Sequence, residues 1–348
     1  MIPELPETDP ALLHFEVEAN YAGWPLARYV AEKLRRPLDP AVLDKILRGA
    51  SLVHGEPVLL PETPVWPGLR FALRKRSSGY RLMQLFIGSE GTLGIVTEVV
   101  LRVFPKPEER ALASFAFRDM ASALEASRRV LRVGWRPAVL RAYDVLESAR
   151  HFAASAPTDR CMLLAISEGP SSLVRAEAAA CAREAAACGG EPVGEAPAVH
   201  WLEKRNTVPE WDFFLEREML ADTIEVAATW DRIGAIYDTV VAALAGAPGV
   251  IMASGHSSHG YPQGTNIYFT FVMKPEDFSR AEAAYLEAWG RALRATLAGG
   301  GTISHHHGIG RLRAPWLAEE LGSAYPLLRD LKRALDPNGI MNPGALLA

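Results

Sequence analysis

The sequence has few cysteines, no long apolar run and no excess of basic charge. Its three cysteines, Cys161, Cys181 and Cys188, lack CxxC spacing, so we expect reduced thiols that pack as small apolar side chains. No stretch approaches the ~20 apolar residues that span a bilayer, and the first residues lack a secretion signal. We therefore expect a cytoplasmic protein with no integral membrane segment.

The charge balance argues against nucleic-acid binding. The 348 residues carry a net charge of −4, with 37 basic and 41 acidic side chains, and such a chain has no broad electrostatic grip on phosphate. The densest basic group, 74–76, is interpreted as a solvated strand end. Length and a hydrophobic fraction of 49% indicate a globular chain of two domains.

The N-terminal third mixes helical and strand patterns. Apolar spacing predicts helices at 10–36 and 39–47, a strand at 69–76, a helical turn at 80–86 and a strand at 92–104. The segment 105–110 breaks the pattern with two prolines and charge, so we place a domain boundary there. The expected division is 1–65 divergent or irregular, 66–106 the end of one domain, 107–330 a second domain, and 331–348 a tail.

Strands and helices alternate after that boundary. Strands are expected at 114–120, 137–145, 160–169, 218–228, 248–256 and 265–273, and helices at 120–134, 147–156, 171–190, 230–246 and 275–301. A further helix and a Pro/Gly-stopped tail end the chain. This order predicts an α+β domain whose helices cover one face of a mostly antiparallel sheet.

Three segments hold more polar chemistry than a plain domain needs. The first, IGSEGTLGIVT, places Gly88, Gly91 and Gly94 around polar residues. Glycine at this density allows positive φ and close approach of the backbone to a ligand. An ordinary tight turn explains the segment equally simply, and composition alone favours that interpretation.

The second segment is GHSSHGYPQGTNIYF, which carries His256, His259, Tyr261 and Tyr268. A Tyr–His pair can pass protons near neutral pH if the site lowers the tyrosine pKa well below its usual ~10. The alternative is a surface hairpin with aromatic cross-strand packing. The density of histidine and tyrosine favours a functional role.

The third segment is GGGTISHHHGIGRLR, in which His305, His306 and His307 are consecutive. Adjacent side chains in an extended loop point in different directions, so separate partners are easier to build than one shared metal. Arg311 and Arg313 follow and could hold an anion. Solvated loop histidines are the alternative, and the catalytic interpretation is favoured.

Together these segments resemble the FAD-linked oxidases of the vanillyl-alcohol-oxidase superfamily that carry the cap domain of D-lactate dehydrogenases and glycolate oxidases. Within that group the chain is similar to the alkyldihydroxyacetonephosphate synthase branch. The resemblance rests on GYRLMQLFIGSEGTLGIVTEVVLRVFPKPE, TWDRI, SGHSSHGYPQGTNIYFTF, GTISHHHGIGRLRAPWL and LKRALDPNGIMNPG, and it covers about residues 70–348.

The resemblance implies a flavoenzyme that uses FAD and acts on a small hydroxy or keto substrate at flavin N5. The implied FAD contacts are Glu90, Gly91, Thr92, Leu93, Gly94, Ile95 and Val96. The implied catalytic residues are the acid/base Tyr268, the run His305, His306 and His307, and Arg141. The implied substrate contacts are His256, His259 and Arg311.

The sequence departs from the family pattern in three places. Where related dehydrogenases have a metal-binding His and Glu, Tyr268 and His306 stand instead, so we expect no metal. Trp211 stands where the synthase has a substrate arginine, although Arg205 or Arg217 could replace it. Residues 1–65 show no glycine-rich pyrophosphate loop, so the front of the flavin domain is expected to be truncated or diverged.

Several functions therefore stay open at this stage. An oxidoreductase of the synthase-like branch is the favoured one. The alternatives are a true alkylglycerone-phosphate synthase of ether lipid synthesis, a D-lactate- or glycolate-type dehydrogenase, and a non-catalytic cap module that needs a partner for flavin. A homodimer is compatible with each of them.

Overall fold

The structure is a computed structural model that describes residues 15–16, 51–53, 56–57, 70–73, 82–99, 101, 103, 105–207 and 211–347. The chain divides into two compact units, Met1–Lys106 and Pro107–Ala348. The division falls where the sequence analysis places its boundary. That these units correspond to a flavin domain and a substrate domain stays a prediction.

The first unit contains a small antiparallel sheet in the order β1-β4-β2-β3. Its elements are β1 (Phe15–Glu16), β2 (Ser51–Val53), β3 (Glu56–Pro57), β4 (Arg70–Leu73) and the 3-10 helix η2 (Leu82–Leu85). The last two match the predicted strand and helical turn.

The helix predicted for 10–36 is wrong at β1, which pairs with β4 because strand pairing overrides a weak helical pattern. The rest of that helix, the one at 39–47 and the basic group 74–76 lie outside the described residues.

The strand predicted for 92–104 does not form where the structure describes that segment. Residues Thr92–Val99 have no regular structure, and Ile95 is 81% exposed. A β-prone segment becomes a strand only when a neighbour takes up its backbone hydrogen bonds. No strand among the described residues pairs with it, which explains the difference.

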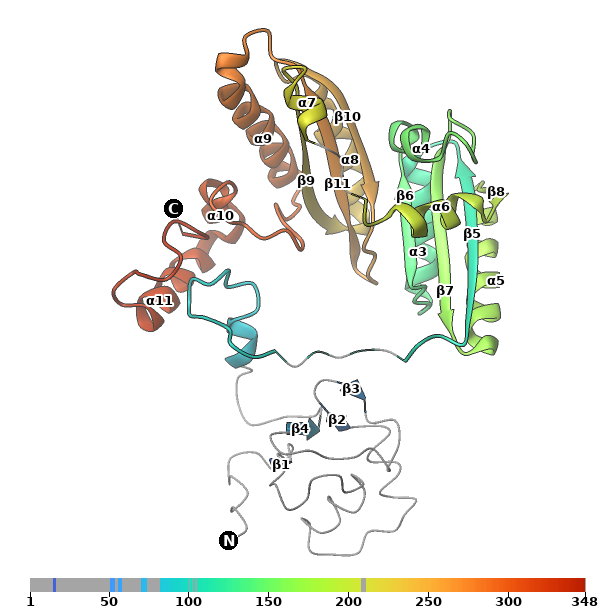
Figure 1. Ribbon diagram of the computed structural model, residues 1–348, viewed down its shortest axis with the longest axis horizontal. Coiled ribbons are helices and arrows are strands. Elements are labelled where there is room, and N and C mark those ends of the chain that lie inside the picture. Colours follow the sequence, from blue (N-terminus) through green and yellow to red (C-terminus); the bar gives the residue numbers. More distant parts are fainter. Residues whose placement is uncertain are drawn as a thin grey trace, which may run out of the picture. The chain divides into compact units, whose positions relative to one another are not determined.

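The second unit is built on a seven-stranded sheet (Figure 1) with the order β8-β5-β7-β6-β10-β11-β9. Every neighbouring pair is antiparallel. Its strands are β5 (Glu109–Phe117), β6 (Val139–Tyr143), β7 (Cys161–Gly169), β8 (Glu191–Gly194), β9 (Leu220–Thr229), β10 (Val250–Ser257) and β11 (Gly264–Met273). The predicted α+β class with an antiparallel sheet is confirmed.

The sheet narrows to a short seam between its two halves. Strands β6 and β10 pair through only two residue pairs, Tyr143↔His256 and Ala142↔Ser257. In Figure 1 the two halves spread apart on either side of this seam. His256 therefore lies in the short pairing that joins the two halves.

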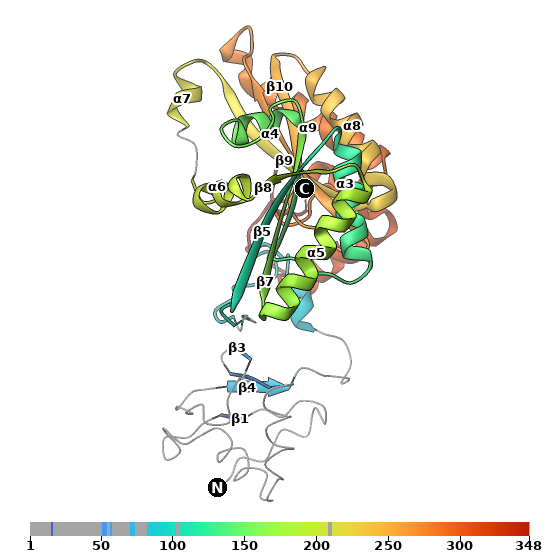
Figure 2. The ribbon, with the colours of Figure 1, turned by 90° about the vertical axis from the view of Figure 1, so that its right-hand side faces the viewer.

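Helices cover one face of the sheet and only part of the other. The helices α3 (Met120–Arg132), α5 (Ser171–Ala187), α8 (Trp230–Ala245) and α9 (Ala281–Ala298) share the main hydrophobic core. On the opposite side lie α4 (Val145–Phe152), α6 (Ala196–Lys204) and α7 (Asp212–Leu215) (Figure 2). The C-terminal part contains η3 (Phe278–Arg280), α10 (Ala314–Leu321), η4 (Gly322–Ala324) and α11 (Tyr325–Leu335). None of the helices that the structure describes is both long and apolar enough to cross a membrane.

Side-chain alternation on β11 separates the core from the open face. Phe269, Phe271 and Met273 are fully buried in the main core, whereas Tyr268, the residue before Phe269, points to the other face. Cys161 and Cys181 are free and buried, and burial raises the pKa of each thiol to about 12. They pack as apolar residues.

Candidate active site

Four polar side chains form a row across the open face of the sheet. The register places His256 opposite both Tyr143 and Tyr268, and Tyr268 opposite Glu225. Directly opposite residues share a face. The His256 ring stacks on Tyr143 with centroids 5.1 Å apart and on Tyr268 at the same distance. The predicted hairpin thus brings tyrosine and histidine together.

A pocket of about 390 Å³ opens over this row. Five residues that the sequence analysis singled out line it: Arg141, His256, His259, Tyr268 and His306. The other lining residues come mainly from β6, α4 and the α6 region: Tyr143, His151, Phe152, His200, Trp201, Lys204, Arg205, Thr207 and Ser258. Sequence reasoning missed Tyr143 and α6.

The pocket wall is cationic and aromatic. The Arg141 guanidinium lies 5.2 Å from the Trp201 ring centroid and donates through Nε to the Tyr143 hydroxyl at 2.9 Å. Arg205 also lies over Trp201, at 5.5 Å, and Lys204 is nearby on the wall. Among the described residues that line the pocket, none is Asp or Glu. Such a wall suits an anionic ligand.

His256 is a buried, neutral ring at the centre of the row. The pKa of His256 is lowered to about 3, chiefly by burial and also by the positive charge of Arg141, while Glu147 acts in the opposite direction. Its Nδ1 is buried without a hydrogen-bond partner among the described residues and lies 3.8 Å from a Glu147 oxygen. A neutral imidazole at pH 7 is the consequence.

Two acids beneath the pocket hold β10 in place around His256. Asp144 accepts hydrogen bonds from the amides of Glu147, at 2.8 Å, and Gly255, at 2.5 Å. Glu147 accepts one from the Ser254 hydroxyl at 2.9 Å. Burial opposes ionisation of Glu147, but its hydrogen bond to His151 and nearby positive charges keep its pKa below the usual value. β10 is thus fixed at the two residues that precede His256, Ser254 and Gly255.

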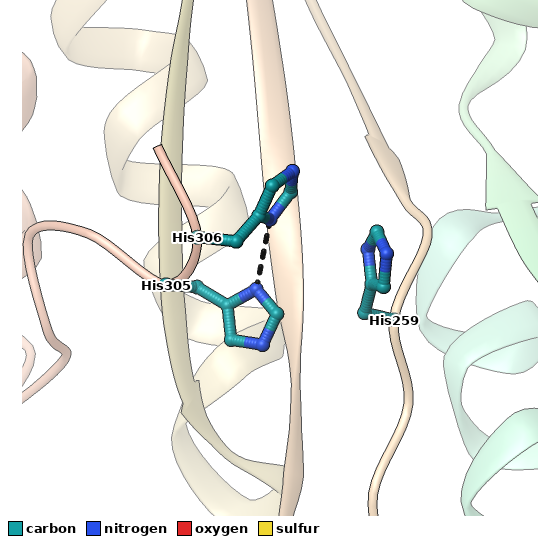
Figure 3. Close-up of side chains that lie close together, drawn as sticks. All are labelled: His259, His305 and His306. Carbon is teal, nitrogen blue, oxygen red and sulfur yellow. Dashed lines mark hydrogen bonds between the residues drawn. The ribbon is translucent and has the colours of Figure 1, made fainter. Parts of the chain in front are cut away.

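The histidine run lies on the loop between α9 and α10 and meets Glu225 of β9. Glu225 accepts hydrogen bonds from the backbone amides of His305, at 3.1 Å, and His306, at 3.0 Å. The His305 Nδ1 lies 2.9 Å from the same carboxylate. Figure 3 shows His305 and His306 side by side and His259 facing them from the neighbouring hairpin. Sequence reasoning missed Glu225, which is 80 residues away from His305.

The three rings in Figure 3 are close enough to share a cation. Ligand atoms of His259, His305 and His306 all lie within 4.8 Å of one another, and so do those of Glu225, His306 and His307. Nδ1 of His305 and of His306 already faces Glu225, however, at 2.9 and 2.5 Å. That the site holds no metal stays a prediction.

His307 packs against Tyr268. Their ring centroids are 4.8 Å apart and the planes are nearly perpendicular. The Tyr268 hydroxyl oxygen accepts a hydrogen bond from Thr223 Oγ1 at 3.1 Å, so its own proton is free to point elsewhere. Burial lowers the pKa of His307. A neutral imidazole beside a phenol is suited to proton transfer.

The remaining predicted substrate contact, Arg311, lies outside this pocket, and so does Arg313. Arg311 donates to the Pro343 carbonyl at 3.1 Å, and buried Arg313 donates to the Gly308 carbonyl at 2.9 Å. The Arg311 contact joins the loop to the tail, whereas the Arg313 contact lies within the loop. Of the two arginines considered as replacements at Trp211, Arg205 lines the pocket, whereas Arg217 lies over the Phe213 ring at 4.1 Å.

The glycine-punctuated segment of the first unit forms a tight turn. Thr92 donates to the Ser89 carbonyl through its amide, at 2.9 Å, and its hydroxyl, at 2.6 Å. Gly88, Glu90 and Gly91 have φ of 81°, 52° and 73°. This is the left-handed conformation that glycine adopts without strain. Contact of Glu90–Val96 with FAD stays a prediction.

Comparisons with known proteins agree on one family. The chain is 31% identical over 298 residues to an uncharacterised FAD-linked oxidoreductase, YgcU, of Escherichia coli strain K12, with 78% of this chain and 59% of the relative covered. It is 28% identical to the alkyldihydroxyacetonephosphate synthase of Dictyostelium discoideum, covering 78% and 49%. It is also 28% identical to glycolate oxidase subunit GlcD of Bacillus subtilis, covering 79% and 59%. The chain thus spans about half to three-fifths of the length of these curated relatives.

A solved structure and a family profile complete the comparison. A crystal structure of alkyldihydroxyacetonephosphate synthase has a TM-score of 0.58 at 24% identity and covers 78% of this chain and 50% of that one, which shows a shared fold. The profile described as FAD linked oxidases, C-terminal domain, matches residues 106–346. The chain therefore belongs to the FAD-linked oxidases, a family of enzymes whose members bind FAD, and it carries their C-terminal domain.

Proposed function

We propose that the pocket above Tyr268 binds a small anionic hydroxy or keto substrate and exchanges a proton with it while FAD acts as the redox partner. The observation that carries the proposal is the row Tyr143, His256, Tyr268 and Glu225 with His307 against Tyr268. The row lies at the bottom of a pocket whose charged lining residues are cations.

Substrate binding follows from the pocket wall. The Arg141 Cζ lies 5.5 Å from the Tyr143 ring centroid and 5.2 Å from that of Trp201. These two rings orient the guanidinium group before a ligand binds. A carboxylate that accepts from this guanidinium forms a charge-assisted pair. Arg141 therefore orients the substrate, and His256, kept neutral by burial, adds no charge of its own beneath it.

Proton movement is the task of Tyr268 and His307. Oxidation of a C–OH group to C=O removes two electrons and two protons. The substrate hydroxyl would give its proton to Tyr268 as Tyr268 gives its own proton to His307, and FAD, when bound, would supply the acceptor for the electron pair and the hydrogen on the carbon. The Thr223 hydroxyl stabilises the phenolate that Tyr268 becomes when it gives up its own proton.

The residues present fit a flavin in both units, each taken by itself. In the first, a left-handed turn at Glu90 leads to exposed Ile95 and Val96, an apolar surface that suits a planar ring. In the second, Tyr268 lines a pocket beside the neutral His256. When bound, FAD supplies the two-electron redox chemistry, and the protein supplies orientation and proton transfer.

Flavin absorbance tests the proposal directly. The full chain, refolded or purified with added FAD, should show protein-bound flavin bands, and anaerobic addition of a 2-hydroxy acid should bleach them. A matched neutral alcohol should leave the bands unchanged because it offers no anion to Arg141. A chain that never retains flavin under these conditions would support the non-catalytic cap module instead.

A second candidate function is the redox-neutral exchange of an acyl for an alkyl group, as in the synthase branch. Lys204 and Arg205 on the pocket wall favour it, because two further cations suit a phosphate-bearing substrate. The two functions differ in the outcome of one measurement. A phosphorylated keto substrate would bind without lasting bleaching, whereas a hydroxy acid would leave the flavin reduced.

A further inference from the structure

The buried carboxylate of Glu225 lies where two histidine-bearing loops meet. Its side chain has no exposed surface, although it stands next to an open pocket. Asn266 Nδ2 donates to Glu225 Oε1 at 2.8 Å, and Asn266 Oδ1 accepts from the His259 amide at 2.8 Å. The Asn266 side chain thus links the His259 hairpin to the carboxylate. Such hydrogen bonds stabilise the charge of a buried carboxylate.

The same carboxylate fixes the backbone of the histidine run. Glu225 Oε2 accepts from the amides of both His305 and His306. A second acid, Glu320, holds the start of the loop through the Ile303 amide at 2.8 Å. The loop that carries the histidine run is therefore held by Glu320 at its start and by Glu225 at His305 and His306. The ring of the following residue, His307, packs against Tyr268.

The contacts favour one nitrogen of His305 as the protonated one. An ionised carboxylate only accepts hydrogen bonds, so the 2.9 Å contact of His305 Nδ1 with Glu225 Oε1 favours a proton on Nδ1. The same Nδ1 also lies 3.0 Å from Nδ1 of His306. His305 Nε2 then accepts from the Tyr261 hydroxyl at 2.8 Å. Both ring nitrogens are occupied by protein groups, and His305 has no nitrogen left for a substrate.

His306 is held in a similar way. Its Nδ1 lies 2.5 Å from Glu225 Oε1, and its ring lines the pocket. His307 differs from both neighbours because its ring lies against Tyr268 at 4.8 Å. Three consecutive histidines therefore have three different surroundings.

We propose that Glu225 is a positioning residue that locks His305 in the Nδ1–H tautomer and holds the loop so that His307, and not His305, exchanges the proton with Tyr268. The first half stands on hydrogen bonds alone. The second half, the division of labour within the run, rests on the proposed function.

Nuclear magnetic resonance of the histidine rings tests the first half without any turnover. In the full chain labelled with ¹⁵N-histidine, long-range ¹H–¹⁵N spectra should show one ring, absent in His305→Gln, as a neutral Nδ1–H tautomer. Glu225→Gln should convert that ring to the Nε2–H form or to a mixture. Glu177→Gln is the matched control, because Glu177 is also buried and accepts from a backbone amide, that of Arg136, at 2.8 Å.

Two results would overturn this half. The first is an Nε2–H tautomer for His305 in the unmodified chain, which does not depend on Glu225→Gln and so holds even if that variant fails to fold. The second is an unchanged His305 ring in a folded Glu225→Gln variant. Glu225→Asp, which keeps the charge, should preserve most of the Nδ1–H population.

Activity tests the second half. His307→Asn should lower kcat by about 10²- to 10⁴-fold, the contribution of a positioned proton-transfer group, with little change in KM. His305→Asn should lower kcat by a smaller factor and keep the pH profile, while Glu225→Gln should shift that profile. Equal effects of His305→Asn and His307→Asn would reject the division of labour. If no variant and no unmodified chain turns over, the proposed function fails while the tautomer result still stands.

Discussion

Tyr268 and His256 stack across adjacent strands, with ring centroids 5.1 Å apart and ring planes 22° apart. They are direct partners in the β10–β11 register. His256 is neutral at physiological pH because burial lowers its pKa to about 3, so the phenol rests on an uncharged aromatic surface. In the proposed mechanism, the proton of Tyr268 therefore moves toward His307 or the substrate, and not toward His256.

Replacing Tyr268 with Phe should abolish turnover and keep flavin binding. The substitution removes only the hydroxyl that accepts from Thr223, so the ring still packs against His256 and His307. We expect kcat to fall by about 10²-fold or more, as for other acid/base residues. The measurements are steady-state kinetics and the visible spectrum of the purified variant.

Tyr325→Phe is the control for this variant, because it removes the same atom from α11, outside the residues that line the pocket. It should behave as the unmodified chain. A Tyr268→Phe variant that turns over at the normal rate would remove the acid/base role from this residue.

Arg141→Lys should raise KM more than it lowers kcat. Lysine keeps the positive charge but loses the planar fork and the stacking on Trp201 and Tyr143. A tenfold rise in KM corresponds to about 1.4 kcal/mol of lost binding, and we expect a change of at least this order. Arg132→Lys, on the last turn of α3, is the control. Equal KM values for both variants would place the substrate anion elsewhere.

Acid should destabilise the fold through His256 before it does so through the carboxylates. The folded-state pKa of His256 is about 3, against a usual 6.5, so below pH 6.5 the unfolded chain binds a proton that the folded chain rejects. The free energy of unfolding therefore falls as pH drops from 6.5 towards 3, by up to about 1.4 kcal/mol per pH unit from this group. Above pH 6.5 the contribution is constant.

Denaturant unfolding between pH 7.5 and pH 5, compared between the unmodified chain and His256→Gln, separates this effect from those of His259 and His307, whose pKa values burial also lowers. The pKa of Glu225 is lowered from 4.5 to about 2, because backbone and side-chain hydrogen bonds outweigh the effect of burial. Protonation of Glu225 therefore lowers the free energy of unfolding only below about pH 4.5. His256→Gln should flatten the pH dependence of the unfolding free energy between pH 6.5 and pH 5. A slope that is the same in the variant would mean that His256 is protonated in the folded protein.

Elemental analysis of the purified chain should find no stoichiometric transition metal. His259, His305 and His306 come close together, but hydrogen bonds to Glu225 already occupy Nδ1 of His305 and hold that of His306. One equivalent of zinc or manganese that resists dialysis would contradict this expectation. In that event His259→Asn should release the metal, while His200→Asn, a histidine of α6 on the far pocket wall, should not.

The predicted elements of the second unit follow the observed ones closely, and the exceptions have identifiable causes. The helix α6 and the strand β8 went unpredicted because both are short and carry a proline, Pro197 and Pro192, and such segments resemble loops. In the first unit, the strand expected at 92–104 is not formed among the described residues of that segment, since β propensity alone does not supply a pairing partner.

The sequence by itself determined the local features of the site. Period-two alternation places Tyr268 on the face opposite Phe269, and the consecutive histidines mark a loop rich in titratable groups. These are properties of neighbouring residues, which side-chain spacing along one strand or helix controls. The family resemblance rests on the same short segments.

Only the tertiary structure decided which distant residues meet. Strand order β6-β10-β11-β9 puts Tyr143 and Glu225 at the two ends of one row, and nothing in the spacing of either strand specifies its neighbour. Glu225 reaches His305 across 80 positions, and α6 brings Arg205 to the pocket. Strand pairing and burial across the whole sheet make these contacts, so they exist only once the sheet has assembled.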